Sequence, residues 1–198
     1  MLRKILYPHI ESLLNQTAGV LHKQGITPNQ LTLGGLALNF LAGWIYASGS
    51  FFFGAVMMLI AALGDMLDGP LARSTGQVSK FGAFLDSTID RYSDFFIFGG
   101  VALYFAKEGQ NGWFLITMGI LAGAFVTSYA KARAENLIEK CDAGIFERPE
   151  RIVILAIGSV FPFLRSLALL VLLIGTNATA VQRILYVRKN LPPPQKVS

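Results

Sequence analysis

Six apolar runs, separated by short polar or glycine-containing connections, make up most of this chain. They lie at about residues 31–47, 51–71, 81–105, 113–129, 152–164 and 167–187. About 20 apolar helical residues cross a bilayer, so the pattern predicts an all-α polytopic membrane protein with six transmembrane helices. The fifth run is short, and snorkelling of the flanking Arg148 and Arg151 would extend it.

Composition excludes the main alternatives to a membrane protein. Of the 198 residues, 53% are hydrophobic and 15% are charged, whereas soluble domains carry about 25% charged residues. The single cysteine, Cys141, excludes a disulfide scaffold. The net charge of +5 does not indicate nucleic-acid binding, because the basic residues lie in short loops between apolar runs. Six spans leave no room for a second domain.

The ends of the chain differ from this core. Between residues 4 and 23, apolar residues recur near helical spacing, which predicts an amphipathic helix on the membrane surface. These residues are Ile5, Leu6, Ile10, Leu13, Leu14, Ala18 and Leu21. We therefore expect one domain over 1–198, with an interfacial helix over 1–28, a six-span core over 29–188 and a disordered tail over 189–198.

Lysine and arginine are distributed unevenly between the two sides of the predicted bundle. Of the 17 such residues, only Lys107 and Arg165 fall on one side. Cytoplasmic loops of membrane proteins carry the excess of positive charge. We therefore expect a multi-pass protein of the cell membrane with both termini in the cytoplasm.

Carboxylates are concentrated where two of the predicted spans meet. Five of the twelve acidic residues are Asp65, Asp68, Asp86, Asp90 and Asp94. The first two share a helical face at i and i+3, and the other three share one at i and i+4. The two helices are consecutive and antiparallel, so these faces can converge. Ionisable groups in membrane spans are costly and usually functional.

Converging carboxylates would repel one another unless a cation lies between them. Oxygen-only ligands suit Mg²⁺ or Mn²⁺, and two histidines and one cysteine do not support a zinc site. The alternative is that the acids form ion pairs with the neighbouring cations Arg73, Lys80 and Arg91. The predicted site would face the cytoplasm.

The same residues resemble a known signature. Residues 65–73 read DMLDGPLAR and residues 82–90 read GAFLDSTID. They are similar to D-x-x-D-G-x-x-A-R…G-x-x-x-D-x-x-x-D, the signature of the CDP-alcohol phosphatidyltransferases, with all eight fixed positions present. The resemblance implies an enzyme that transfers the phosphatidyl group of a CDP-linked lipid to an alcohol and releases CMP. It also implies a homodimer.

The resemblance assigns roles to individual residues. Asp65, Asp68 and Asp86 would hold one or two Mg²⁺ ions, and Asp90 would contribute to the second and act as general base in a direct displacement. Gly69 and Arg73 would bind the CDP-linked lipid. The start of the first span, which resembles the family's P-x-x-x-T pattern, would bind it too, as would a serine hydroxyl near the donor phosphates. Those further positions are Asn29, Gln30, Leu31, Thr32 and Ser79. Asn29 is a departure, since the inositol-phosphate relatives carry Asp there.

Three further segments resemble the branch that makes phosphatidylinositol phosphate from inositol 1-phosphate, including its archaeal ether-lipid relatives. They read SYAKARAE at 128–135, FERPER at 146–151 and QR at 182–183. In that branch the matching cations form a pocket for the acceptor's phosphate, and here they are Lys131, Arg133, Arg151 and Arg183. The alternative is that these cations serve only to orient the protein in the membrane.

Other functions remain open from sequence alone. The same chemistry with glycerol 3-phosphate, serine or free inositol as acceptor is the first alternative. A cation channel or carrier lined by the carboxylates is the second, although the acids cluster at one end of the spans. The roles of Asp94, Glu147 and Glu150 are not assigned beyond pairing with nearby arginines.

Overall fold

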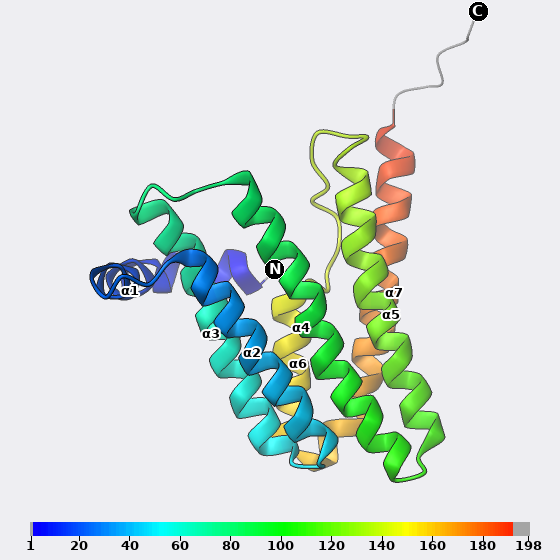
Figure 1. Cartoon of the computed structure of the whole chain (residues 1–198). Coiled ribbons are helices and arrows are strands. Elements are labelled where there is room, and N and C mark those ends of the chain that lie inside the picture. The colour runs from blue at the N-terminus through cyan, green and yellow to red at the C-terminus, as the bar shows by residue number, and fades with distance from the viewer. Residues whose placement is uncertain (1, 192–198) are drawn as a thin grey trace, which may run out of the picture.

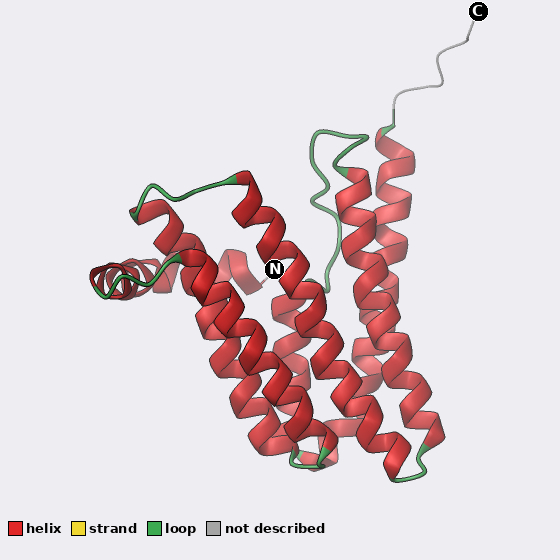
Figure 2. Ribbon diagram, in the orientation of Figure 1, coloured by secondary structure: helices red, strands yellow, loops and turns green. Residues whose placement is uncertain are grey.

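In the computed structural model, the described residues are 2–191, with side chains described for 11–191. They form seven α-helices and one 3₁₀ helix, and this part of the chain contains no strand (Figures 1 and 2). The helices are α1 (Leu2–Lys23), α2 (Pro28–Ala47), α3 (Phe51–Ser74), α4 (Lys80–Lys107), α5 (Asn111–Ala134), α6 (Arg148–Val160), η1 (Pro162–Leu164) and α7 (Arg165–Asn190). The all-α prediction is confirmed, and each predicted run falls within a helix or a helical pair.

Local signals in the sequence set where the site-bearing helices begin. Thr27 and Gln30 form a capping box around Pro28 at the start of α2. Ser79 caps α4, its hydroxyl accepting from the Gly82 amide at 2.9 Å. At the start of α6, the Glu147 amide donates to the Glu150 carboxylate at 3.1 Å. These three helix starts lie at the same end of the molecule.

The six helices from α2 to α7 pack as a closed ring. Around it, α2 contacts α4, α4 contacts α5, α5 contacts α7, α7 contacts α6, α6 contacts α3, and α3 returns to α2. Figure 1 shows α6 behind α4, with the α2–α3 and α5–α7 pairs on either side. An apolar core lies between them and includes the fully buried Tyr46, Met58, Ile120 and Leu172. The helix ends that carry the predicted site lie toward the upper end in this view.

Two glycines allow α2 and α4 to approach each other closely. A Cβ atom on Gly43 would lie 2.2 Å from the Phe96 carbonyl oxygen, and one on Gly100 would lie 2.1 Å from the Gly43 carbonyl oxygen. Small residues permit such contacts between membrane helices. This contact holds α4, which carries Asp86 and Asp90, against α2.

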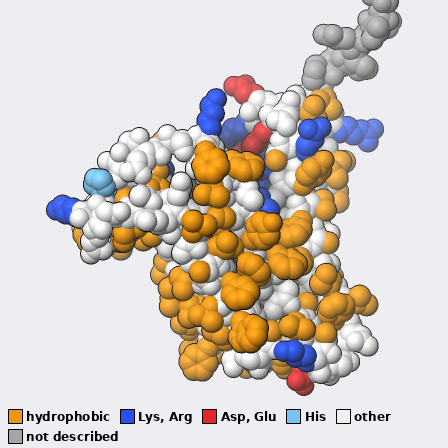
Figure 3. Space-filling model, in the orientation of Figure 1, with side chains coloured by type: hydrophobic (Ala, Val, Ile, Leu, Met, Phe, Trp, Pro, Cys, Tyr) orange, Lys and Arg blue, Asp and Glu red, His pale blue; other side chains and the backbone are white. Residues whose placement is uncertain are grey.

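The outer surface of the bundle is largely apolar. Figure 3 shows hydrophobic side chains over the body of the bundle and cations gathered at the upper end. By length and composition, three stretches within the described residues can cross a membrane: Phe51–Ser74, Asn111–Ala134 and Pro162–Asn190. Helix α4 carries three aspartates, and α6 has only 13 residues. The six-span topology therefore remains a prediction.

Helix α1 lies across the bundle and packs against α3 (Figure 1). Leu14 and Ala18 are buried, whereas Leu13 is 64% exposed. The side chains of the predicted apolar positions Ile5, Leu6 and Ile10 lie outside the described part. The predicted tail from residue 192 onward also lies outside it.

Candidate active site

The acidic residues predicted to converge lie at the ends of α3 and α4 that we expect to face the cytoplasm. Asp65 and Asp68 are in the last turns of α3, and Asp86 and Asp90 are in the first turns of α4. Thr32, one turn into α2, donates its hydroxyl to Asp68 Oδ2 at 3.0 Å. Asp86 lies close enough to Asp68 and Asp90 for their charges to repel. The ends of three helices thus surround one group of carboxylates.

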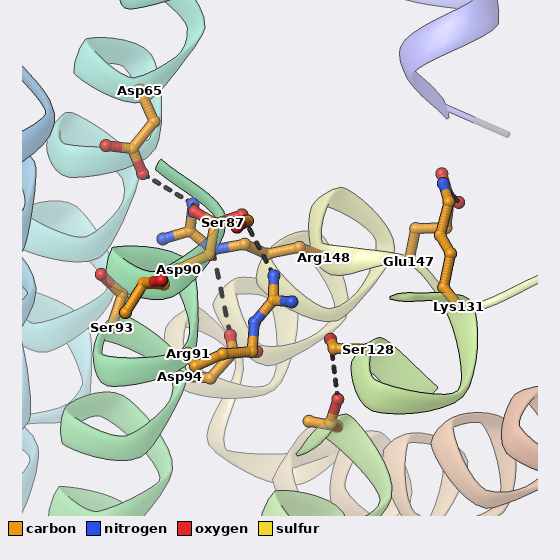
Figure 4. Close-up of polar contacts among 12 residues, drawn as sticks. Asp65, Ser87, Asp90, Arg91, Ser93, Asp94, Ser128, Lys131, Glu147 and Arg148 are labelled. Carbon is orange, nitrogen blue, oxygen red and sulfur yellow. Dashed lines mark hydrogen bonds and ion pairs between the residues drawn. The ribbon is translucent and has the colours of Figure 1, made fainter. Parts of the chain in front are cut away.

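Arg148 joins the two acidic helices. Its Nη1 donates to Asp65 Oδ2 at 2.8 Å and also to Asp90 Oδ1, so one nitrogen contacts carboxylates from α3 and α4 (Figure 4). The Arg148 side chain is only 12% exposed. This contact was not predicted: Arg148 was expected to extend a short span, and no sequence pattern connects it to Asp65, 83 residues away.

The donor set fits a hard divalent cation in type and charge. Among the described residues, no group of three or more His, Cys, Asp or Glu side chains is close enough to enclose a metal ion. Asp65 and Asp90 nevertheless gather around one positively charged group, the Arg148 guanidinium. Carboxylate oxygens are the ligands that Mg²⁺ and Mn²⁺ prefer. Two of the four predicted ligands, Asp65 and Asp90, therefore lie around a position that accepts positive charge.

A second, fully buried ion pair lies one turn deeper. Arg151 Nη2 lies 2.6 Å from Asp94 Oδ2, and both side chains are 2% exposed. Arg148 Nε is 3.9 Å from the other oxygen of Asp94, and Asn39 Nδ2 donates to Ser93 Oγ at 3.1 Å. Asp94 thus pairs with Arg151 on α6, whereas Arg91 Nη2 lies 3.3 Å from Asp90 Oδ2. The Nε of Arg151 is buried and has no partner within the described residues.

Two of the four predicted acceptor-binding cations meet at one carboxylate. Glu147 Oε1 lies 3.6 Å from Lys131 Nζ and 3.3 Å from Arg183 Nη2, and Figure 4 shows Lys131 and Glu147 side by side. Arg183 is 3% exposed and also donates to the carbonyls of Thr127 and Ala143, at 2.7 and 2.9 Å. Its guanidinium is therefore fixed in place before any ligand binds.

Arg133 lies two residues beyond Lys131 on α5 and is exposed. Residues two apart on a helix face different sides. Its predicted place in an acceptor pocket stays a prediction.

The residues predicted to bind the CDP-linked lipid surround the same acidic end. Asn29, Gln30, Leu31 and Thr32 form the first turn of α2, where Gln30 Oε1 accepts from the Thr27 amide at 2.9 Å. A Cβ atom on Gly82 would lie 3.1 Å from Ser79 Oγ and 3.8 Å from Asn29 Oδ1, so the first turns of α2 and α4 are neighbours. Gly69 and Arg73 follow Asp68 on α3, where a Cβ on Gly69 would contact Arg73 Nη1 at 3.4 Å.

The model of the CDP-alcohol phosphatidyltransferase family matches residues 25–185, which include α2 to α6 and most of α7. The chain belongs to the CDP-alcohol phosphatidyltransferase family. It is therefore an enzyme, and with its apolar surface and spanning helices it is a membrane protein. This excludes the channel or carrier as the basic function of the chain.

Relatives of this CDP-alcohol phosphatidyltransferase are named as synthases of inositol phosphate lipids. An archaetidylinositol phosphate synthase of Pyrococcus horikoshii is 40% identical over 96% of this chain and 98% of its own length. A phosphatidylinositol phosphate synthase of Streptomyces avermitilis is 35% identical over 96% of this chain and 83% of its own length.

Solved structures of phosphatidylinositol phosphate synthase from Mycobacterium tuberculosis share the fold. The structure with CDP-DAG bound has a TM-score of 0.83 and 33% identity, and covers 92% of this chain and 96% of its own. The structure in complex with manganese and citrate has a TM-score of 0.81 and 34% identity, and covers 91% of this chain and 90% of its own. A divalent metal and a CDP-linked lipid are thus bound by a protein similar to this one.

Proposed function

We propose that this enzyme transfers the phosphatidyl group of CDP-diacylglycerol, or its ether-lipid analogue, to a hydroxyl of inositol 1-phosphate and releases CMP. One observation carries the proposal. Glu147 and Arg148 are consecutive, yet Glu147 contacts the cations Lys131 and Arg183, whereas Arg148 contacts the carboxylates Asp65 and Asp90. The basic and acidic groups are therefore adjacent, as a phosphorylated acceptor attacking a metal-bound pyrophosphate requires.

In this proposal the four aspartates of the signature, Asp65, Asp68, Asp86 and Asp90, hold Mg²⁺ or Mn²⁺. The bound ion would screen the pyrophosphate and stabilise the charge on departing CMP. Asp90 takes the proton of the acceptor hydroxyl as its oxygen bonds to the β-phosphorus and the bond from that phosphorus to CMP breaks. Arg148 holds the Asp90 carboxylate in place through its contact with Oδ1. Positioning contributes much of the rate enhancement in such displacements.

Donor binding is assigned to the residues that line the upper ends of α2, α3 and α4. These residues are Asn29, Gln30, Leu31, Thr32, Gly69, Arg73 and Ser79. Their proximity to the aspartates supports the assignment, because the pyrophosphate of the donor must reach the metal site. The hydroxyl of Thr32 already contacts Asp68, which places this part of α2 against the acidic group.

Acceptor binding is assigned to Lys131, Arg133, Arg151 and Arg183. The fixed guanidinium of Arg183 supports this, since arginine binds phosphate with two parallel hydrogen bonds. The buried Nε of Arg151 is a further donor in the same region. Free inositol carries no anionic group for these cations to bind, and serine carries a carboxylate but no phosphate.

We further propose that α2 to α7 cross the cell membrane, with the site and both termini in the cytoplasm, within a single domain that forms homodimers. The distribution of charge supports the orientation, because among the residues with described side chains the other end carries only Lys107 and Arg165 as cations. Helix α6 has 13 residues, fewer than the roughly 20 that cross a bilayer. Its polar first turn would therefore lie inside the membrane rather than at its surface.

The test is CMP release by purified protein in detergent with CDP-diacylglycerol, Mg²⁺ and one acceptor per reaction. The acceptors are inositol 1-phosphate, free inositol, glycerol 3-phosphate and serine. Release only with inositol 1-phosphate supports the proposal. Release with glycerol 3-phosphate instead would keep the chemistry and the phosphate pocket but replace the acceptor. Release with free inositol or serine alone would remove the assigned role of the basic pocket.

A further inference from the structure

One face of α2 lies against the aspartate-bearing helices. Three buried positions at helical spacing, Thr32, Gly35 and Asn39, form this face. Thr32 donates to Asp68 on α3, and Asn39 donates to Ser93 on α4. Gly35 lies between these two contacts, and its nearest neighbour is Asp65 on α3.

Gly35 makes space for the Asp65 carboxylate. A Cβ atom at this position would lie 2.3 Å from Asp65 Oδ1 and 3.4 Å from its Cγ, and real Cβ atoms essentially never come within 3.0 Å of another heavy atom. Gly35 is helical and its φ is not positive. The position therefore does not require glycine for its backbone conformation. What a side chain would add is a steric clash with Asp65.

The other oxygen of the same carboxylate is held from the opposite side. Asp65 Oδ2 accepts from Arg148 Nη1 at 2.8 Å. The carboxylate thus lies between the bare backbone of α2 and the first residue of α6. A methyl group on residue 35 would push against the end of the Asp65 side chain rather than against a helix backbone. The side chain can rotate away, whereas a helix backbone cannot.

We propose that Gly35 is a positioning residue for Asp65: its lack of a side chain sets the place of this carboxylate and, through it, the affinity of the site for a divalent cation. The inference rests on the metal-binding role proposed above for Asp65. Residues that position metal ligands without touching the ion typically change metal affinity by about 10–100-fold when they are replaced.

Neighbouring glycines provide matched controls on the same helix. A Cβ on Gly34 would meet nothing within 4 Å, so Gly34→Ala adds the same methyl group one residue away without the contact. A Cβ on Gly43 would meet the backbone of Phe96. Gly43→Ala therefore represents a purely structural clash.

The experiment measures Mn²⁺ binding to the purified full chain in detergent by electron paramagnetic resonance, without lipid or acceptor. We expect Gly35→Ala to weaken Mn²⁺ binding about tenfold or more, and Gly34→Ala to bind as the unmodified protein does. Equal Mn²⁺ affinity in Gly35→Ala and Gly34→Ala would overturn the inference and leave the proposed function standing. Failure of the unmodified protein to bind Mn²⁺ would overturn the metal assignment of Asp65 and the inference with it.

A second measurement covers the case in which Gly35→Ala also destabilises the fold. The melting temperature is compared for Gly35→Ala, Asp65→Ala and the double variant. If the added methyl group acts on the Asp65 carboxylate, removing that carboxylate relieves the clash, and Gly35→Ala lowers the melting temperature less in the Asp65→Ala background. An equal decrease in both backgrounds would overturn the inference, because the methyl group would then be acting on something else.

Discussion

Replacing Arg151 by methionine tests whether its ion pair with Asp94 holds α6 against α4. The two charged groups are 2.6 Å apart, and both side chains are 2% exposed. Methionine keeps much of the side-chain volume but leaves the Asp94 carboxylate buried without its nearest cation. Removing one partner of a buried pair costs about 3–5 kcal/mol. Arg148 Nε remains 3.9 Å from Asp94 and supplies part of the missing charge, so we expect about 3 kcal/mol, the lower end of that range.

The assay is unfolding of the purified protein in mixed micelles, followed by circular dichroism. Arg151→Met, Asp94→Asn and the double variant form a double-mutant cycle, in which we expect the double variant to be more stable than the sum of the single changes predicts. Lys140→Met, which removes an exposed ion pair with Asp142 at 3.0 Å, is the control and should leave stability unchanged. Arg151→Met with unaltered stability would refute the reasoning.

The remaining predictions concern the reaction and the packing of the bundle. Asp90→Asn should abolish CMP release while donor binding, measured with a labelled CDP-linked lipid, persists; retained turnover would remove Asp90 from the role of general base. Arg183→Ala should raise KM for a phosphorylated acceptor more than it lowers kcat, in steady-state assays across acceptor concentrations; an unchanged KM would mean that the guanidinium binds no acceptor phosphate. Gly43→Ala should destabilise the fold by about 1–3 kcal/mol because its Cβ would meet the Phe96 backbone. In the same unfolding assay Gly99→Ala, with nothing within 4 Å, is the control, and equal stability of the two variants would contradict the close contact.

Features that depend on local sequence were predictable. The apolar runs correspond to the ring helices because apolar length and helix-breaking residues act over a few residues. The spacing of Asp65 and Asp90 predicted that they would converge, but the predicted route, direct packing of consecutive helices, is not the observed one, since α2 lies between α3 and α4 in the ring. Arg148 now demonstrates that convergence by contacting both.

Contacts between distant segments were not predictable in the same way. Asp94 pairs with Arg151 across 57 residues, and Glu147 contacts Arg183 across 36. Which arginine meets which carboxylate depends on how α6 enters the ring, and no periodicity in the chain encodes that. The space that Gly35 leaves for Asp65 likewise becomes visible only when α2 and α3 are packed.

The proposed function requires that the acceptor carries a phosphate into the lipid product. The most direct measurement is mass spectrometry of the lipid formed when the enzyme is given CDP-diacylglycerol, Mg²⁺ and equal concentrations of inositol 1-phosphate, free inositol and glycerol 3-phosphate. We expect one product, phosphatidylinositol phosphate, which retains the phosphate of its acceptor. Phosphatidylinositol as the main product would contradict the proposed function, because the cations around Glu147 would then have no acceptor phosphate to bind.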